Sequence, residues 1–124
     1  MNLLNVFFLS LTLLFFSACS HTKLPKKHNE RYYQTQLCKK LGGKMEYVLS
    51  DRTRVDCLTK TYAIEVDFGK KWAEGIGQAL FYSEMTGKKP AVGLIVDKNK
   101  EQRYLKRLYK VSEPYGIKVF EIKK

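Results

Sequence analysis

The chain has 124 residues and carries 23 Lys and Arg against 12 Asp and Glu, which gives a formal net charge of +11. This length is enough for one folded domain with a modest core. The two histidines, His21 and His28, both precede the region expected to fold, which argues against a histidine-based catalytic triad. No Cys or His spacing is typical of a zinc site.

An uncharged, apolar segment opens the chain. The run from Leu3 to Phe16 is shorter than the about 20 apolar residues of a spanning helix, and it is typical of a secretory signal. The residues that follow, Phe16-Ser17-Ala18-Cys19, resemble the bacterial lipobox, in which the Cys becomes acylated. We therefore expect residues 1–18 to be a cleaved signal peptide and Cys19 to be the site of lipidation. The alternatives are an uncleaved anchor and an ordinary signal with an incidental Cys.

Residues 19–29 are polar and basic and contain a proline, a composition that predicts a flexible tether. Several acyl chains on Cys19 would hold the protein durably at the membrane of the cell envelope. Ser20 stands where an Asp commonly retains such lipoproteins at the inner membrane. The outer membrane is therefore favoured, with the domain on its periplasmic or surface side.

The folded domain is expected over residues 30–124, and its hydrophobic periodicity changes along the chain. Helical spacing comes first, and Gly42-Gly43 ends it. Alternating apolar and polar residues then predict a meander of three antiparallel strands. The final strand, helix and strand imply a parallel pair with a right-handed crossover, so the sequence predicts an α/β fold with a mixed sheet. The expected elements are a helix over 31–41, three strands between 44 and 69, a helix over 70–86, a strand over 90–97, a helix from a cap at Asn99 to Val111, and a strand over 117–122.

The helix over 70–86 is expected to have an apolar face and a bordering polar stripe. The apolar face comprises Trp72, Ala73, Ile76, Ala79, Leu80 and Ser83. The polar stripe comprises Lys71, Glu74, Gln78 and Tyr82. A solvated helix side would have the same pattern.

Two further cysteines, Cys38 and Cys57, follow Cys19. An exported compartment permits a disulfide between them. Geometry decides whether they pair, and the sequence leaves both states open.

Three acidic residues fall on two neighbouring expected strands. Asp56 lies on the second strand, while Glu65 and Asp67 lie two residues apart on the third and so share one face. A turn near residues 59–60 would bring Asp56 close to Glu65. Packed carboxylates repel one another, and a fold tolerates them mainly when a cation neutralises them. Oxygen ligands suit Mg²⁺ or Mn²⁺, whereas the alternative is a sheet edge that faces water, where acidic residues are ordinary.

The ordered motifs resemble the PD-(D/E)xK nuclease superfamily. Its core has a helix, a three-stranded meander, a helix and a strand, the order expected here for residues 31–96. Asp56, in Arg54-Val55-Asp56, matches the Asp of the second strand. Glu65-Val66-Asp67 matches Glu-x-Lys of the third strand, except that Asp67 replaces the Lys. The segment from Gln78 to Tyr82 fits the Gln-hydrophobic-x-x-Tyr motif of the exonuclease branch.

This resemblance implies a restriction-endonuclease-like fold and a Mg²⁺- or Mn²⁺-dependent phosphodiesterase that acts on nucleic acid. It implies that Asp56 and Glu65, with the Val66 carbonyl, hold the metal, and that Glu30 completes the site. Asp67 or Lys71 would position the attacking water, and Gln78 and Tyr82 would hold the DNA or the shape of the site. The superfamily's Lys orients that water, and Asp67 stands in its place in this sequence.

The basic composition supports two other classes of protein. One is a catalytically inactive nuclease-like domain that binds the phosphate backbone of nucleic acid. The other is an envelope lipoprotein whose positive charge meets anionic lipid headgroups. The sequence leaves open whether DNA or RNA is bound, whether cleavage is from an end or internal, and how many copies associate.

Overall fold

The computed structural model describes residues 26–124, so the expected signal peptide, Cys19 and the tether before Lys26 lie outside the described residues. The helices and strands follow one another in the expected order. Within residues 26–124, no helix is long and apolar enough to cross a membrane. The elements are α1 (Glu30–Lys40), β1 (Lys44–Val48), β2 (Arg54–Leu58), β3 (Tyr62–Phe68), the short 3-10 helix η1 (Gly69–Lys71), α2 (Trp72–Thr86), β4 (Lys89–Val96), α3 (Gln102–Ser112) and β5 (Lys118–Lys123).

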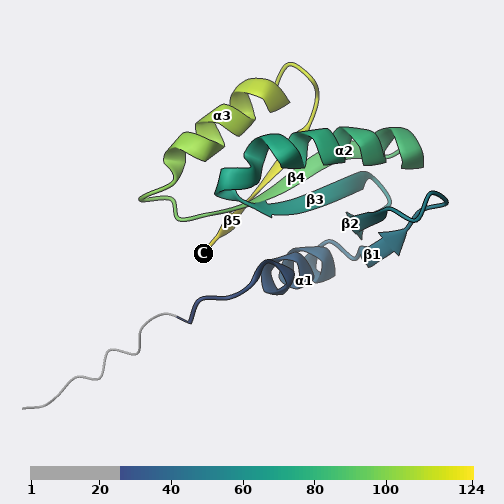
Figure 1. The fold of residues 1–124 in the computed structure, drawn as a ribbon, viewed down its shortest axis with the longest axis horizontal. Helices are drawn as coiled ribbons and strands as arrows, with labels where there is room; N and C mark the ends of the chain where they lie inside the picture. The colour runs from purple at the N-terminus through teal and green to yellow at the C-terminus, as the bar shows by residue number, and fades with distance from the viewer. Residues whose placement is uncertain (1–25) are drawn as a thin grey trace, which may run out of the picture.

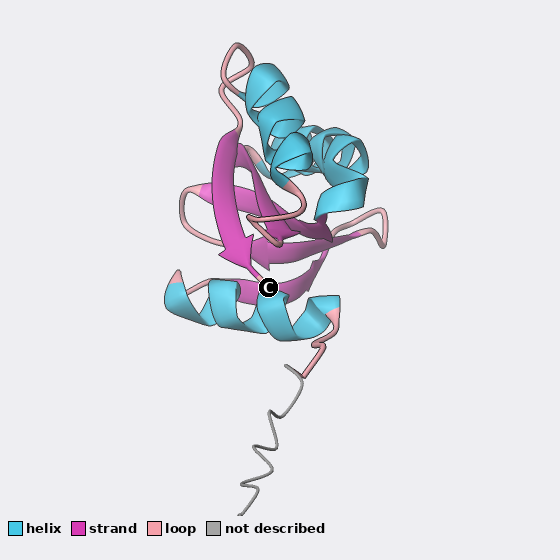
Figure 2. Ribbon diagram, turned by 90° about the vertical axis from the view of Figure 1, so that its left-hand side faces the viewer, coloured by secondary structure: helices cyan, strands magenta, loops and turns pink. Residues whose placement is uncertain are grey.

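The strands form one mixed sheet of five strands in the order β1-β2-β3-β4-β5. The β1–β2 and β2–β3 pairs are antiparallel, and the β3–β4 and β4–β5 pairs are parallel. Helix α1 covers one face of this sheet, and α2 and α3 lie together on the other (Figures 1 and 2). The chain is therefore a three-layer α/β domain, in agreement with the expected fold class.

Local signals explain where the helices begin and end. The Asn29 side chain accepts a hydrogen bond from the Tyr32 main-chain N–H at 3.0 Å and so caps the start of α1. Gly87 ends α2 in the left-handed conformation, with φ of 67°, which glycine adopts without strain. Asn99 does not cap α3 as expected. Its N–H donates to Asp97 Oδ1 at 2.9 Å in a turn that precedes the helix, which begins at Gln102.

The core lies in two layers, one on each face of the sheet. Cys38, Ile64, Val66 and Ile95 are buried between α1 and the sheet. On the other face, α2 and α3 bury a second cluster, which includes Ala79, Val92, Leu94, Tyr104 and Leu108. Strand β3 is buried on both sides because helices cover both faces.

The expected inward face of α2 is partly confirmed: Ala79 is buried, and Trp72 and Ile76 pack against the core, but Ala73 and Leu80 are exposed. Its buried residues are Gly75, Ala79 and Tyr82, whereas Leu80 is 40% exposed. Gly75 explains the difference, because a Cβ there would lie 3.3 Å from Val92 and 3.4 Å from the Asp67 carboxylate. The helix therefore turns its smallest residue toward the sheet, and this rotation carries Tyr82 inward.

Candidate functional site

Strands β2 and β3 separate at Asp56. Their paired positions are Cys57 with Ile64 and Leu58 with Ala63. One residue further, the Asp56 side chain takes the place of a main-chain partner, since its Oδ2 accepts a hydrogen bond from the Val66 N–H at 2.8 Å. This bond fixes the Asp56 carboxylate at the point where the strands part.

Glu65 and Asp67 project from β3 toward the layer that contains α2. Both are only 4% exposed. Glu65 Oε1 and Asp67 Oδ2 have no hydrogen-bond partner within the described residues. Leaving such groups unpartnered in a folded interior costs about 1–3 kcal/mol each, and more when they are charged. Unpartnered buried oxygens of this kind indicate a place where a proton or a cation is held.

The two neighbouring carboxyl groups of Asp56 and Glu65 share one negative charge at neutral pH. Burial and then the charge of Asp56 raise the pKa of Glu65 to about 9. Burial also raises the pKa of Asp56, although the Val66 N–H opposes this by stabilising the charged form. Glu65 therefore carries the proton, and its carboxyl group donates a hydrogen bond to Asp56.

Asp67 lies in a different local field. Burial and the charge of Glu30 raise the pKa of Asp67 to about 7, and nearby Lys71 opposes that rise. The Lys71 Nζ, four residues further along the chain at the end of η1, is 3.6 Å from Asp67 Oδ1. In turn, the charge of Asp67 raises the pKa of Lys71. Lys71, which could compensate for the missing lysine of the Glu-x-Lys motif, thus contacts Asp67, the residue that stands in place of that lysine.

An open cavity of about 500 Å³ unites residues that the sequence placed on separate elements. It is lined by Asp56 and Glu65 from the two strands and by Gln78 and Tyr82 from α2, with Glu30 at the start of α1. Asp67 and Lys71 are not among its lining residues. Five of the seven residues expected to bind metal or substrate, or to act in catalysis, therefore surround this cavity, which we call the acidic pocket.

Tyr82 forms part of the buried wall of the acidic pocket and is only 7% exposed. Burial, followed by the charges of Glu65 and Asp56, raises the pKa of Tyr82. Its hydroxyl group therefore stays neutral and can donate a hydrogen bond. Gln78 lies one turn earlier on the same helix and lines the same cavity.

Helix α1 contributes a side chain that the sequence analysis missed. Gln34 is 4% exposed, and its Nε2 donates to the Asp56 carbonyl at 2.9 Å and to Glu46 Oε1 at 2.8 Å. Gln34 lies three and four residues before Leu37 and Cys38, on the same helical face. A polar residue on that apolar face is the sequence signal that could have identified it.

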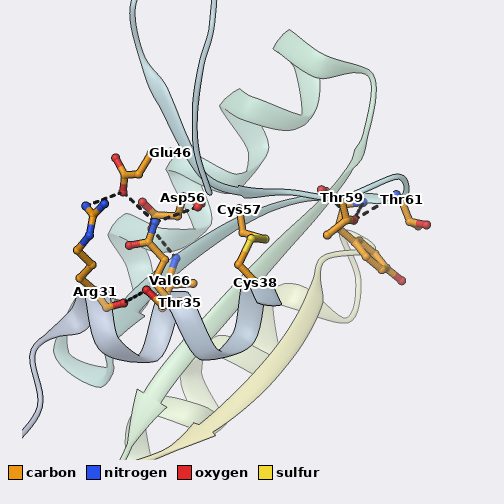
Figure 3. Close-up of a disulfide and its surroundings, with 11 residues drawn as sticks. Arg31, Thr35, Cys38, Glu46, Asp56, Cys57, Thr59, Thr61 and Val66 are labelled. Carbon is orange, nitrogen blue, oxygen red and sulfur yellow. Dashed lines mark hydrogen bonds and ion pairs between the residues drawn. A yellow bond between two sulfur atoms is a disulfide. The ribbon is translucent and has the colours of Figure 1, made fainter. Parts of the chain in front are cut away.

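Glu46 is the second residue that the sequence analysis missed. It lies within β1 with φ of 51°, a left-handed conformation that is costly outside glycine and often occurs at functional sites. Its carboxylate is 3.2 Å from Arg54 and 3.8 Å from Arg31. Figure 3 shows Arg31 and Glu46 pointing toward each other beside Asp56. No periodic pattern signals a left-handed residue inside a strand.

A disulfide joins α1 to β2 next to the acidic pocket. Cys38 and Cys57, the pairing that the sequence left open, have their Cα atoms 5.6 Å apart and are bonded (Figure 3). Cys57 follows Asp56 directly, and Cys38 lies one turn after Gln34. The bond therefore holds the helix against the strand at the level of the site.

The donor chemistry of the acidic pocket suits a hard divalent cation. Asp56 and Glu65 offer carboxylate oxygens, including the buried Glu65 Oε1 that has no partner within residues 26–124. As placed, no three Asp, Glu, His or Cys side chains of the described chain converge as a metal-binding group. The fit therefore depends on the carboxyl pair and its unpartnered oxygen.

Comparison with known proteins identifies no family for this chain. No family model, curated protein or solved structure matches the chain.

Proposed function

We propose that the domain is a divalent-metal-dependent phosphodiesterase that acts on nucleic acid and has a restriction-endonuclease-like fold. The observation that carries this proposal is the acidic pocket itself. Asp56 and Glu65 meet there with Gln78 and Tyr82, although they come from β2, β3 and α2. The order of elements from α1 to β4 is also the order of the superfamily core that the motifs resemble.

The residues of the acidic pocket have three proposed roles: metal binding, phosphate contact and orientation of the substrate. Asp56 and Glu65, with Glu30 nearby, would hold Mg²⁺ or Mn²⁺, which when bound polarises a phosphate oxygen and lowers the pKa of a water molecule. Arg31 and Arg54 are more than half exposed at the cavity edge, where they can contact phosphate oxygens. Gln78 and the neutral Tyr82 hydroxyl orient the substrate by hydrogen bonds.

The Asp67 carboxyl group has a role in this proposal despite replacing a lysine. With its pKa raised to about 7, it is partly ionised near neutral pH and can exchange a proton with water. Lys71 lies beside it and supplies the positive charge that the superfamily carries at position 67. The Asp67–Lys71 pair thus replaces a single lysine in the proposed site.

The export and anchoring of the domain belong to the same proposal. The Cys38–Cys57 disulfide supports it, because disulfides persist in oxidising compartments outside the cytosol. We propose that Cys19 carries the lipid and that the domain works at the cell envelope. A Cys19→Ser variant should then lose incorporation of labelled palmitate and leave the membrane fraction.

Cleavage of nucleic acid tests the proposed activity. The protein lacking residues 1–19 should degrade plasmid or single-stranded DNA with Mg²⁺ or Mn²⁺ and stop when EDTA is added. Asp56→Asn and Glu65→Gln should each lower the rate by about a hundredfold or more. Glu84→Gln changes an exposed acid of α2 and serves as the control that keeps full activity.

The same assay can overturn the proposal. If the folded protein shifts DNA in a gel but leaves it intact with either metal, it is a binding domain without catalysis. If it binds anionic vesicles and has no preference for DNA, its positive charge binds anionic lipid headgroups and not nucleic acid.

A further inference from the structure

A second cavity, of about 630 Å³, lies at the end of the sheet where three parallel strands finish. Phe68 is the last residue of β3, and Asp97 and Lys124 directly follow β4 and β5. Both views show the C-terminus close to α1 (Figures 1 and 2). In open α/β sheets, the carboxyl ends of the strands are where ligands commonly bind. We call this cavity the strand-end pocket.

The lining of the strand-end pocket carries more positive than negative charge. It contains Lys26, Lys27, Lys70 and Lys124, and the acids Asp97 and Glu101. Glu101 is already engaged, because it accepts hydrogen bonds from Lys124 Nζ at 2.6 and 2.8 Å and from the Asp97 N–H at 2.9 Å.

Three ammonium groups of this pocket form no ion pair within the described residues. The ion pairs of residues 26–124 include none for Lys26, Lys27 or Lys70. Every Asp and Glu of the chain lies within those residues. The three lysines are therefore available to an anion from outside the chain.

Aromatic rings form a wall of the same cavity. The rings of Tyr33 and Phe68 meet edge to face with their centroids 6.1 Å apart. The Lys124 ammonium lies 5.4 Å from the Phe68 ring centroid. An aromatic wall beside ammonium groups suits a ligand that has both a flat ring and a phosphate, which is the chemistry of a nucleotide. A free inorganic anion would leave the rings unused.

Strand β3 connects the strand-end pocket to the acidic pocket. Glu65 lines the acidic pocket, and Phe68 lies three residues further, about 10 Å along the strand. Helix α1 also borders both, through Glu30 on one side and Tyr33 on the other. Both cavities therefore border the start of α1.

We propose that the strand-end pocket binds one unpaired nucleotide of a single-stranded nucleic acid, with its base against Tyr33 and Phe68 and its phosphate at Lys26, Lys27 and Lys70. This assignment rests on the proposed function for its class of ligand. It adds a preference for single strands, because a base held in a duplex cannot reach the aromatic wall.

Binding without metal tests the pocket separately from catalysis. The full chain, purified in a mild detergent, is titrated against a labelled oligodeoxyadenylate in EDTA, with fluorescence anisotropy as the readout. Phe68→Leu should weaken binding about tenfold, because base–aromatic stacking is lost. Lys70→Gln should weaken it several-fold and lower the salt dependence by about one phosphate contact. Lys106→Gln removes the same charge from α3 and should change binding less than twofold.

Each outcome bears on the proposal. Unchanged affinity in both Phe68→Leu and Lys70→Gln would overturn it, and Lys70 is exposed enough that its variant keeps the fold. Equal competition by inorganic polyphosphate and oligonucleotide would also overturn it, since the base would then contribute nothing. Selective loss in the two variants, with no cleavage by the parent protein in Mg²⁺, would support the pocket and reject the nuclease. Cleavage with normal binding in both variants would reject the pocket alone.

Discussion

The buried carboxyl group of Glu65 makes the free energy of unfolding depend on pH. Its pKa is about 9 in the folded protein, against an ordinary value of 4.5. Between these values the folded state retains a proton that the unfolded state has lost. The stability associated with Glu65 is therefore complete below about pH 4.5 and declines as the pH rises toward 9.

A Glu65→Gln variant should remove most of this dependence. Glutamine has the shape of the protonated acid and can still donate to Asp56, but it never becomes charged. At pH 8 without metal, we expect the variant to melt about 5 °C or more above the parent protein, and the gap should narrow at pH 5. Differential scanning calorimetry across this range measures both effects.

Glu84→Gln is the matched control because Glu84 is exposed on α2. Its melting temperature should follow that of the parent protein at every pH. A Glu65→Gln variant that is destabilised equally at pH 5 and pH 8 would contradict a buried, repelled carboxyl group.

Gln34 permits a second test at the scale of a single side chain. A Gln34→Met variant keeps the volume of the side chain but leaves the Asp56 carbonyl and the Glu46 carboxylate without their donor. The free energy of unfolding should fall by about 1–3 kcal/mol. Because Asp56 also loses its support, we expect slower cleavage of nucleic acid under conditions where the variant remains folded.

Gln36→Met, on the exposed side of the same helix, is the control for that substitution. It should change neither the urea midpoint nor the cleavage rate. If both variants behave alike, the Gln34 hydrogen bonds do not position Asp56.

Among the elements, α1 depends most on a covalent bond. The Cys38–Cys57 disulfide spans 19 residues of sequence, and closing a loop of that size stabilises a folded chain by about 3 kcal/mol. Gly43 lies so close to both sulfur atoms that any larger residue there would meet them. The bond therefore holds α1, with Gln34, over the edge of the acidic pocket.

Reduction of this disulfide should loosen the site before the rest of the domain. We expect dithiothreitol, or the Cys38→Ala/Cys57→Ala double variant, to lower the urea midpoint and the cleavage rate together. Treating the double variant with the reductant should cause no further change, which controls for other effects of the reagent. Equal midpoints for the oxidised and reduced parent would show that α1 is held by packing alone.

The elements also show what sequence can and cannot predict. The alternation from Tyr62 to Phe68 and the apolar run of β4 correctly predicted strands. The burial of β3 does not follow its alternation, because Glu65 and Asp67 are buried along with their apolar neighbours. The rotation of α2 could not be read in the same way. Its buried side carries Gly75 and Tyr82 beside the expected Ala79, while Leu80 and Phe81 are exposed, so the apolar pattern predicted only part of the buried face.

The same limit applies to the candidate site. Asp56, Glu65, Gln78 and Tyr82 could be chosen from motif order, since each lies on a regular element whose neighbours are set by the fold. Gln34 and Glu46 reach the acidic pocket through the packing of α1 across the sheet and through a left-handed residue in β1. The helical spacing of Gln34 indicates only that it faces the sheet, and neither propensity nor spacing predicts the left-handed residue in β1.

On the scale of the whole molecule, a chain of net charge +11 surrounds a pocket whose lining includes four acids, with three arginines beside them. The basic surface and the acids of the pocket have opposite effects on a phosphate backbone. Surface lysines and arginines attract it and make binding weaken steeply with salt, whereas Asp56 and its acidic neighbours repel it when no cation is bound. Divalent metal should therefore raise affinity for nucleic acid at fixed ionic strength.

An Asp56→Asn/Glu65→Gln double variant separates the attraction by surface lysines and arginines from the repulsion by the pocket acids. In EDTA it should bind DNA several-fold more tightly than the parent protein, because the negative charge that the carboxyl pair shares is removed. Added Mg²⁺ should then raise the affinity of the parent and leave that of the variant unchanged, when ionic strength is held constant. Glu113→Gln, an exposed acid after α3, should respond to Mg²⁺ as the parent does. Equal affinities of parent and double variant, with and without Mg²⁺, would mean that nucleic acid binds away from the acidic pocket and that the carboxyl pair does not hold the metal for it.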